Sequence, residues 1–90
     1  MKTVRRTTQF KKDIKRLLKR HKDFTVFKTI LNGLLEGNAP APQYHDHQLV
    51  GEYIGYRECH LEPDWLLIYE TTPDSVTLIR TGTHSDLFKT

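Results

Sequence analysis

The stretch YRECHLEPDWLLIY, from Tyr56 to Tyr69, contains two runs of strand-forming residues that meet at the turn 62–64. Successive side chains of a strand alternate between the two faces of a sheet, so Cys59 and Leu61 share one face, which we expect to be buried. The same alternation sends Glu58 and His60 to the open face. The second run is apolar on both faces, which is typical of a central strand. The sequence here predicts an antiparallel hairpin at the centre of a sheet.

The segments around this hairpin predict an α+β fold. Strands are expected over residues 52–61, 65–71 and 75–82, which are separated by the turn signals EPD and TPD, and a short first strand is expected over 3–6. Helical spacing of apolar residues predicts helices over about 8–21, with Thr8 as N-cap, and 23–36, closed by Gly37. Residues 37–48 are expected to form a loop. The order is β-α-α-β-β-β, with two N-terminal helices on one face of a small, mainly antiparallel sheet.

Ninety residues with 37% hydrophobic and 28% charged composition are typical of one soluble domain, expected to span residues 1–90. No apolar run is long enough to cross a membrane or to form a signal peptide, so we expect a cytoplasmic protein without a membrane partner. The single cysteine, Cys59, agrees with a reducing compartment. It is interpreted first as a small buried hydrophobic residue and alternatively as a nucleophile.

Charge is distributed unevenly along the chain. Residues 1–28 carry eleven Lys and Arg against two Asp, a balance of +9, whereas residues 29–90 carry three basic against nine acidic residues, a balance of −6. A basic helix of this kind either is a solvated face or binds a polyanion or an acidic partner. Under the second interpretation its contacts are Lys11, Lys12, Lys15, Arg16, Lys19 and Arg20.

Titratable side chains gather on several of the expected elements. Histidine exchanges protons near neutral pH, so two of His47, His60 and His84 can serve as general acid and general base, while arginine offsets phosphorane charge. This combination is suited to metal-free cleavage of RNA, in which the ribose 2′-OH attacks the adjacent phosphorus. The pair His45 and His47 is a weak metal-ligand signal. Trp65 is either a core residue or a base-stacking surface.

The motifs YHDHQL, GYRECHLEPDWLLIY and RTGTHSDLF, behind two basic helices, resemble those of the YafQ-type branch of the RelE/ParE toxin superfamily. The resemblance covers nearly the whole chain. It implies a RelE-like fold and a toxin of a type II toxin-antitoxin system that cuts mRNA on the ribosome without metal or cofactor. It also implies a cognate antitoxin as partner, besides the ribosome and mRNA.

The resemblance also implies roles for particular residues. The positions expected to be catalytic are His47, His60, Asp64 and His84, and those expected to contact substrate are Arg57, Trp65, Arg80 and Phe88. His47 with Asp64 is expected on the attacking side, His84 on the leaving side, and His60 as an orienting or second basic group, although these roles are exchangeable.

Two positions differ from common family patterns, and two other functions remain open. Gln48 follows His47 where relatives commonly have proline, and Glu58 stands where some have aspartate. A gyrase-inhibiting binder with the same fold is the alternative without catalysis, but such members lack the convergent histidines. A metal-dependent hydrolase that uses the same histidines is a third possibility.

Overall fold

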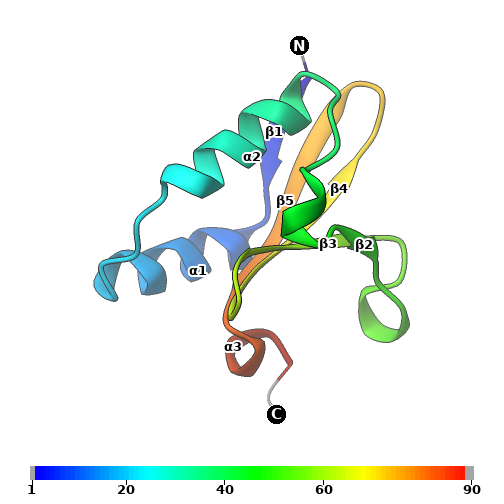
Figure 1. Ribbon diagram of the computed structural model, residues 1–90. Coiled ribbons are helices and arrows are strands. Elements are labelled where there is room, and N and C mark those ends of the chain that lie inside the picture. Colours follow the sequence, from blue (N-terminus) through cyan, green and yellow to red (C-terminus); the bar gives the residue numbers. More distant parts are fainter. Residues whose placement is uncertain (1, 89–90) are drawn as a thin grey trace.

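The computed structural model describes residues 2–88 of the chain. It contains a five-stranded sheet, two long N-terminal helices that lie on one side of it, and a short C-terminal helix beside the end of the last strand (Figure 1). The strands are β1 (Thr3–Arg6), β2 (His47–Gln48), β3 (Arg57–Glu62), β4 (Trp65–Thr71) and β5 (Ser75–Gly82). The helices are α1 (Thr8–Lys19), α2 (Thr25–Leu35) and α3 (His84–Phe88), with 3-10 turns at Pro42–Tyr44 and Gly51–Tyr53.

The sheet has the order β1-β5-β4-β3-β2, so β4 is its central strand, as predicted. β2 to β5 pair antiparallel, and β1 pairs parallel with β5. The parallel pair is possible because the α1–α2 hairpin and the segments after it lie between β1 and β5 in the chain. The α+β class and the packing of the two helices on one face are therefore confirmed.

Local hydrogen bonds explain where the two long helices begin and end. The N-cap of α1 is Thr7 and not the predicted Thr8, because the Thr7 hydroxyl accepts the N–H of Phe10 at 2.9 Å. Helix α2 is closed by the predicted glycine, since Gly37 has a φ of 87°, its N–H donates to the Leu34 carbonyl at 3.0 Å, and Asn38 N–H donates to the Gly33 carbonyl at 2.9 Å. These bonds form a Schellman motif, for which a left-handed glycine is favourable.

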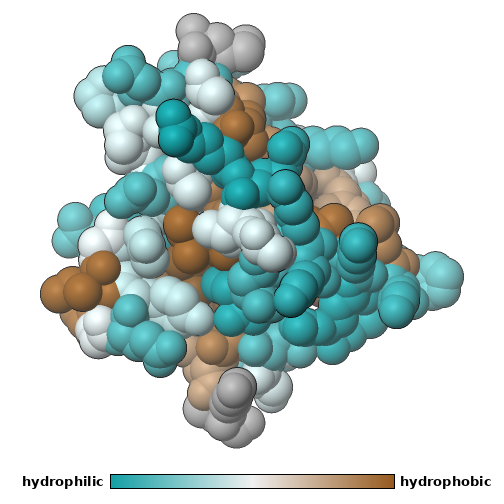
Figure 2. All heavy atoms as spheres, turned by 180° about the vertical axis from the view of Figure 1, so that it is seen from behind, coloured by the Kyte–Doolittle hydropathy of each residue, from teal (hydrophilic) through white to brown (hydrophobic). Residues whose placement is uncertain are grey.

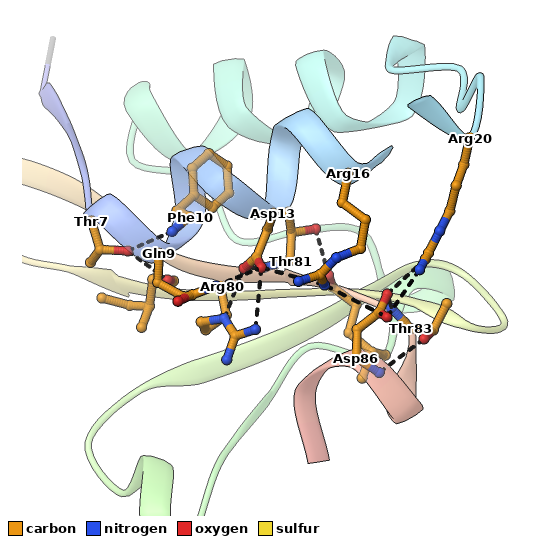
Figure 3. A network of polar contacts seen from close by, with 12 residues as sticks. Thr7, Gln9, Phe10, Asp13, Arg16, Arg20, Arg80, Thr81, Thr83 and Asp86 are labelled. Atoms are coloured by element: carbon orange, nitrogen blue, oxygen red, sulfur yellow. Dashed lines mark hydrogen bonds and ion pairs between the residues drawn. The ribbon is translucent and has the colours of Figure 1, made fainter. Parts of the chain in front are cut away.

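Beyond the end of β1, side chains at the start of α1 and within it form hydrogen bonds to the free backbone edge of β5. Thr7 donates its hydroxyl to the Ile79 carbonyl at 2.8 Å. Further along, the fully buried Asp13 accepts the backbone N–H of Thr81 at 3.1 Å and the Arg80 side chain at 2.8 Å (Figure 3). A buried carboxylate requires such partners, since an unpaired charge in the interior is costly. Asp13 therefore fixes the basic helix to the last strand.

Both faces of the sheet are covered, but to different extents. On the helix side, Cys59, Leu61 and Trp65 pack with the apolar faces of α1 and α2 in the main core. On the opposite face, Leu66 and Ile68 pack with Leu87 of α3 in a smaller cluster. Seen from behind, the surface is largely hydrophilic with separate apolar patches (Figure 2). The predicted burial of Cys59 and Leu61 is confirmed, with exposed fractions of 0% and 5%.

Three segments differ from the sequence-based expectations. The predicted strand over 52–61 begins only at Arg57, because residues 51–53 form a 3-10 turn. The predicted loop over 37–48 contains the short strand β2 and a 3-10 turn at Pro42–Tyr44. Helix α3 was not expected. The described residues 2–88 include no helix that is long and apolar enough to span a membrane.

Helix α3 begins with a capping box. Thr83 accepts the Asp86 N–H at 3.1 Å, and the Asp86 carboxylate accepts the Thr83 N–H at 3.0 Å. The pattern Thr-x-x-Asp was therefore the sequence signal for this helix. Gly82 precedes it with a φ of 154°, and a Cβ at this position would lie 2.9 Å from side-chain atoms of Asp86. Gly82 is therefore required for the close approach of α3 to the end of β5.

Candidate active site

Three histidines form a row on the sheet face opposite α1 and α2. They come from β2, β3 and the start of α3, and the ring centroid of His60 lies 6.2 Å from that of His47 and 5.9 Å from that of His84. We call His47, His60 and His84 the histidine row. His45 lies beside it, with its ring 6.0 Å from His60. The structure therefore brings together all three histidines that the sequence singled out.

Asp64 contacts one end of this row. Its Oδ1 accepts the backbone N–H of His84 at 2.9 Å and lies 2.6 Å from the His84 ring Nδ1. These hydrogen bonds hold the pKa of the Asp64 carboxyl below its usual value. The sequence-based expectation grouped Asp64 with His47, and the structure pairs it with His84 instead. A carboxylate only accepts, so His84 Nδ1 carries the proton and Nε2 is left for substrate.

Glu58 lies beneath the other two histidines. Its Oε1 is 3.4 Å from Nε2 of both His47 and His60, and its side chain is only 7% exposed. The His47 ring is held from its other side, because Nδ1 donates to the His45 carbonyl at 2.8 Å. The buried Glu58 carboxylate is thus close enough to offset a positive charge on the imidazole of either His47 or His60. Sequence reasoning treated Glu58 only as a departure from relatives, although alternation placed it on the same face as His60.

Arg57 lies on the other face of the sheet. It is the register partner of Tyr69, whose ring belongs to the helix-side core. Its guanidinium donates to Asp46 at 2.7 and 2.8 Å, and the Tyr69 hydroxyl donates to the same carboxylate. In this structure Arg57 thus has a structural partner and lies away from the histidine row, and its expected contact with substrate stays a prediction. Arg57 and Tyr69 hold Asp46, and with it the loop that carries His47.

Trp65 is buried, with 1% of its surface exposed. Its ring packs edge-on against Phe24 at 5.3 Å, and Nε1 donates to the Thr81 hydroxyl at 2.8 Å. A base cannot stack on a ring that is enclosed in this way. The expectation that Trp65 contacts substrate is therefore wrong, and the core interpretation holds.

Arg80 and Phe88 extend the face beyond the histidine row. The Phe88 ring is 6.5 Å from that of His84 and 5.9 Å from that of Tyr53. Arg80 NH1 lies 3.4 Å from the Tyr53 hydroxyl, while its other nitrogens donate to Asp13, which raises the pKa of the Arg80 guanidinium. Sequence reasoning missed Tyr53, because it placed this residue in a regular strand.

The six basic residues of the first helix fall into two groups. Arg20 donates to Asp86 at 2.8 and 3.2 Å, and Arg16 lies 3.6 Å from the same carboxylate (Figure 3). The Arg20 hydrogen bonds hold the pKa of Asp86 well below its usual range. The four lysines, by contrast, are exposed to solvent; they are Lys11, Lys12, Lys15 and Lys19.

Cys59 is not suited to nucleophilic chemistry. It is fully buried, and burial, together with the charges of Asp46 and Glu58, raises the pKa of its thiol to about 12. A thiol attacks as the thiolate, which is scarce at neutral pH when the pKa is this high. Within residues 2–88, no group of three or more His, Cys, Asp and Glu side chains is arranged to hold a metal ion.

Comparison with known proteins relates this chain to bacterial toxins. Residues 2–89 match the family described as "Bacterial toxin of type II toxin-antitoxin system, YafQ". The chain is 46% identical over 81 residues to the mRNA interferase toxin YafQ of Escherichia coli strain K12, covering 89% of this chain and 88% of that protein.

Solved structures give the same relationship. The toxin in the E. coli DinJ-YafQ toxin-antitoxin complex is 42% identical, with a TM-score of 0.86 and 97% of each chain covered. A copper-bound mutant toxin from Helicobacter pylori is 35% identical, with a TM-score of 0.91, and the match covers 98% of this chain and 100% of that one.

Proposed function

Since this chain belongs to the YafQ family of bacterial toxins of type II toxin-antitoxin systems, we propose that it is a metal-independent endoribonuclease that cuts mRNA on the ribosome. The curated E. coli relative is named an mRNA interferase. The observation that carries the proposal is the convergence of the histidine row with two carboxylates, Asp64 and Glu58, on one accessible face.

The proposed reaction needs one base and one acid. A base removes the proton of the ribose 2′-OH, the O2′–P bond forms, the P–O5′ bond breaks, and an acid gives its proton to the departing 5′-oxygen. The products carry a 2′,3′-cyclic phosphate and a 5′-hydroxyl. DNA lacks the attacking hydroxyl and is not cut by this route.

We assign the acid to His84 and the base to His47. Asp64 accepts the His84 Nδ1–H, as the carboxylate does in a Ser-His-Asp triad, and in the imidazolium form the ring presents its Nε2–H to the leaving oxygen. When His47 takes the 2′-OH proton, Glu58 offsets the charge of the imidazolium. His60, which shares Glu58 and lies between the two rings, orients the phosphate.

The exposed lysines of α1 support binding to the ribosome. Lys11, Lys12, Lys15 and Lys19 are free to contact ribosomal RNA phosphates, and several such contacts add up to decades of affinity through counterion release. Arg16 and Arg20, in contrast, have a structural partner in Asp86. The lysines therefore carry more of this proposed binding than the arginines.

A cognate antitoxin is the second proposed partner, because a solved E. coli relative forms a complex with DinJ. The exposed lysines favour an acidic segment that folds along α1 and blocks approach to the ribosome. Hydrogen exchange of the toxin-antitoxin complex distinguishes an antitoxin that blocks approach to the ribosome from one that covers the active site. Protection of the α1 amides supports blocking of the ribosome along α1, whereas protection confined to β4, the strand that begins at Trp65, argues against it.

The decisive experiment compares cleavage of one mRNA under four conditions, with and without ribosomes and with and without EDTA. EDTA is added as its Mg²⁺ complex, so that the ribosomes keep their Mg²⁺ while transition metals are removed. We expect cleavage only with ribosomes, and we expect EDTA to leave the cleavage rate unchanged. A 2′,3′-cyclic phosphate end identifies the attack by 2′-OH. Rapid cutting of free RNA, or loss of cutting after removal of transition metals, contradicts the proposal. Inhibition of gyrase without RNA cleavage supports the alternative binder.

A further inference from the structure

A hollow of about 560 Å³ lies next to the histidine row, beyond Phe88, and the cleavage steps proposed above do not use it. It is enclosed by α1, the 3-10 turn at Gly51–Tyr53, β5 and α3. Its lining residues include Arg16, Glu52, Tyr53, Arg80, Asp86 and Phe88. The volume falls within the range of sites that hold a small ligand of nucleotide size.

We infer that this hollow is a nucleotide subsite, which holds the base of the mRNA nucleotide adjacent to the cut and in which Tyr53 and Glu52 determine base preference. The inference rests on the proposed function. To the proposed function it adds a base-binding site and a role for Tyr53 and Glu52, which neither the sequence motifs nor the cleavage chemistry requires.

The aromatic wall is the first support. The rings of Tyr53 and Phe88 lie 5.9 Å apart at 84°, so an apolar corner is formed by one ring face and one ring edge. Phe88 is 38% exposed, and its ring is 6.5 Å from that of His84. Unstacked RNA bases bind to such exposed aromatic rings, and a base held here belongs to a nucleotide next to the histidine row.

The guanidinium groups are the second support. Arg80 is fixed by two hydrogen bonds to Asp13 (Figure 3). Its NH1 lies 3.4 Å from the Tyr53 hydroxyl, so its remaining N–H groups lie beside the aromatic corner. Arg16 lies 3.6 Å from both Asp13 and Asp86 and lines the same hollow. Guanidinium groups held in this way are preorganised to donate to phosphate or to stack on a base.

The rim of the hollow supplies the proposed selectivity. Glu52 is exposed and lines the hollow next to Tyr53. A carboxylate only accepts hydrogen bonds, so it favours a base edge with an amino group, which cytosine, adenine and guanine have and uracil lacks. The O4 of uracil is an acceptor and is repelled. We therefore expect the subsite to prefer a base with an amino group over uracil.

The test measures binding and not cleavage. The 2′-O-methyl trinucleotides AAA, CCC and UUU lack the attacking hydroxyl, and their binding to the full chain is followed by NMR. We expect shifts of the Tyr53 ring and of the Arg80 Nε–H, with tighter binding of AAA and CCC than of UUU. Loss of stacking in Tyr53→Ala weakens binding by about tenfold. Tyr53→Phe, which keeps the ring, binds like the wild type.

Two further variants complete the design. Ile54→Ala is the matched control, because Ile54 lies in the same turn, is 73% exposed and does not line this hollow. It leaves binding unchanged. Glu52→Gln, at an exposed position, removes the preference against UUU without affecting folding.

The inference is overturned if the trinucleotides shift neither Tyr53 nor Arg80, or if folded Tyr53→Ala binds as tightly as the wild type. Should Tyr53→Ala unfold, two other results decide the question. They are the NMR shifts of Tyr53 and Arg80 in the wild type and the order in which Glu52→Gln binds the three trinucleotides. A protein that binds trinucleotides here but never cuts mRNA contradicts the proposed function and leaves only an RNA-binding subsite, without its place beside a cut. A protein that cuts mRNA but fails the binding test contradicts the subsite alone.

Discussion

A single carboxylate oxygen of Asp64 contacts His84 twice, at 2.9 Å from the backbone N and at 2.6 Å from ring Nδ1. Both side chains are well exposed, at 65% for Asp64 and 48% for His84. The pair is therefore held by local geometry at the face where substrate approaches, and not by burial in the core.

This geometry makes Asp64→Asn a sharp test of the proposed acid. The amide can still accept the backbone N–H through its oxygen, but it no longer fixes the imidazole as a carboxylate does. We expect the cleavage rate to fall by about 10²- to 10⁴-fold, as for loss of acid-base catalysis, with an unchanged thermal midpoint. Glu62→Gln, a nearby exposed carboxylate paired with Lys22, is the control. Full activity of Asp64→Asn would remove Asp64 from the mechanism.

The histidines themselves give a second prediction. His84→Ala and His47→Ala should each abolish most cleavage and relieve growth arrest, because each removes one proposed proton-transfer group. His45→Ala, from the same loop and outside the proposed chemistry, is the control for loop structure. Cleavage is measured on ribosomes at saturating mRNA. If both single variants kept full activity, the assignment of acid and base would fail.

The exposed lysines predict a salt dependence. Reversal of Lys12, Lys15 and Lys19 to Glu should weaken ribosome binding and reduce the slope of log affinity against log salt by about 0.7 to 0.9 per lost phosphate contact. Lys28→Glu, at an exposed position on α2, is the matched control. Binding is measured by co-sedimentation between low and physiological salt. A flat salt response in the wild type would mean that the lysines form only a solvated helix face.

The hydrogen bonds to Asp46 predict a stability effect with a functional consequence. Tyr69→Phe deletes the hydroxyl that donates to Asp46 and leaves Arg57 as the remaining partner. Loss of a hydrogen bond to a charged group should lower the free energy of unfolding by about 1.5–3 kcal/mol, measured in urea. Cleavage should fall as well, because the loop that carries His47 is held less firmly. Tyr44→Phe is the control, and equal stability of the two variants would contradict this role of Tyr69.

Burial of Cys59 predicts an alkaline response. Its pKa in the folded protein is raised to about 12, above the unfolded value of about 8.5. The stability that this group contributes is therefore fully present below about pH 8.5 and is lost as the pH rises toward the folded pKa. A thiol reagent at pH 8 should modify the urea-unfolded protein at once and the native protein only slowly. Rapid labelling of the native protein would show that the thiol is accessible.

The sequence by itself determined the fold class, most of the elements and the family. Period-two alternation identified the hairpin and its buried Cys59 and Leu61, and the motif around His60 and Asp64 indicated the toxin family. These inferences succeeded because they depend on neighbours in the chain. Helix α3 was also within reach, since the capping box between Thr83 and Asp86 is a local signal.

Only the tertiary structure decided which groups meet. Alternation shows that Arg57 and His60 lie on opposite faces, but the pairing of Arg57 with Asp46 depends on the return of a distant loop. The burial of Trp65 against Phe24 and the pairing of Asp64 with His84 likewise join residues far apart in the chain. Such contacts depend on strand register and on what covers each face of the sheet. These are properties of the packed chain, and local residue patterns do not encode them.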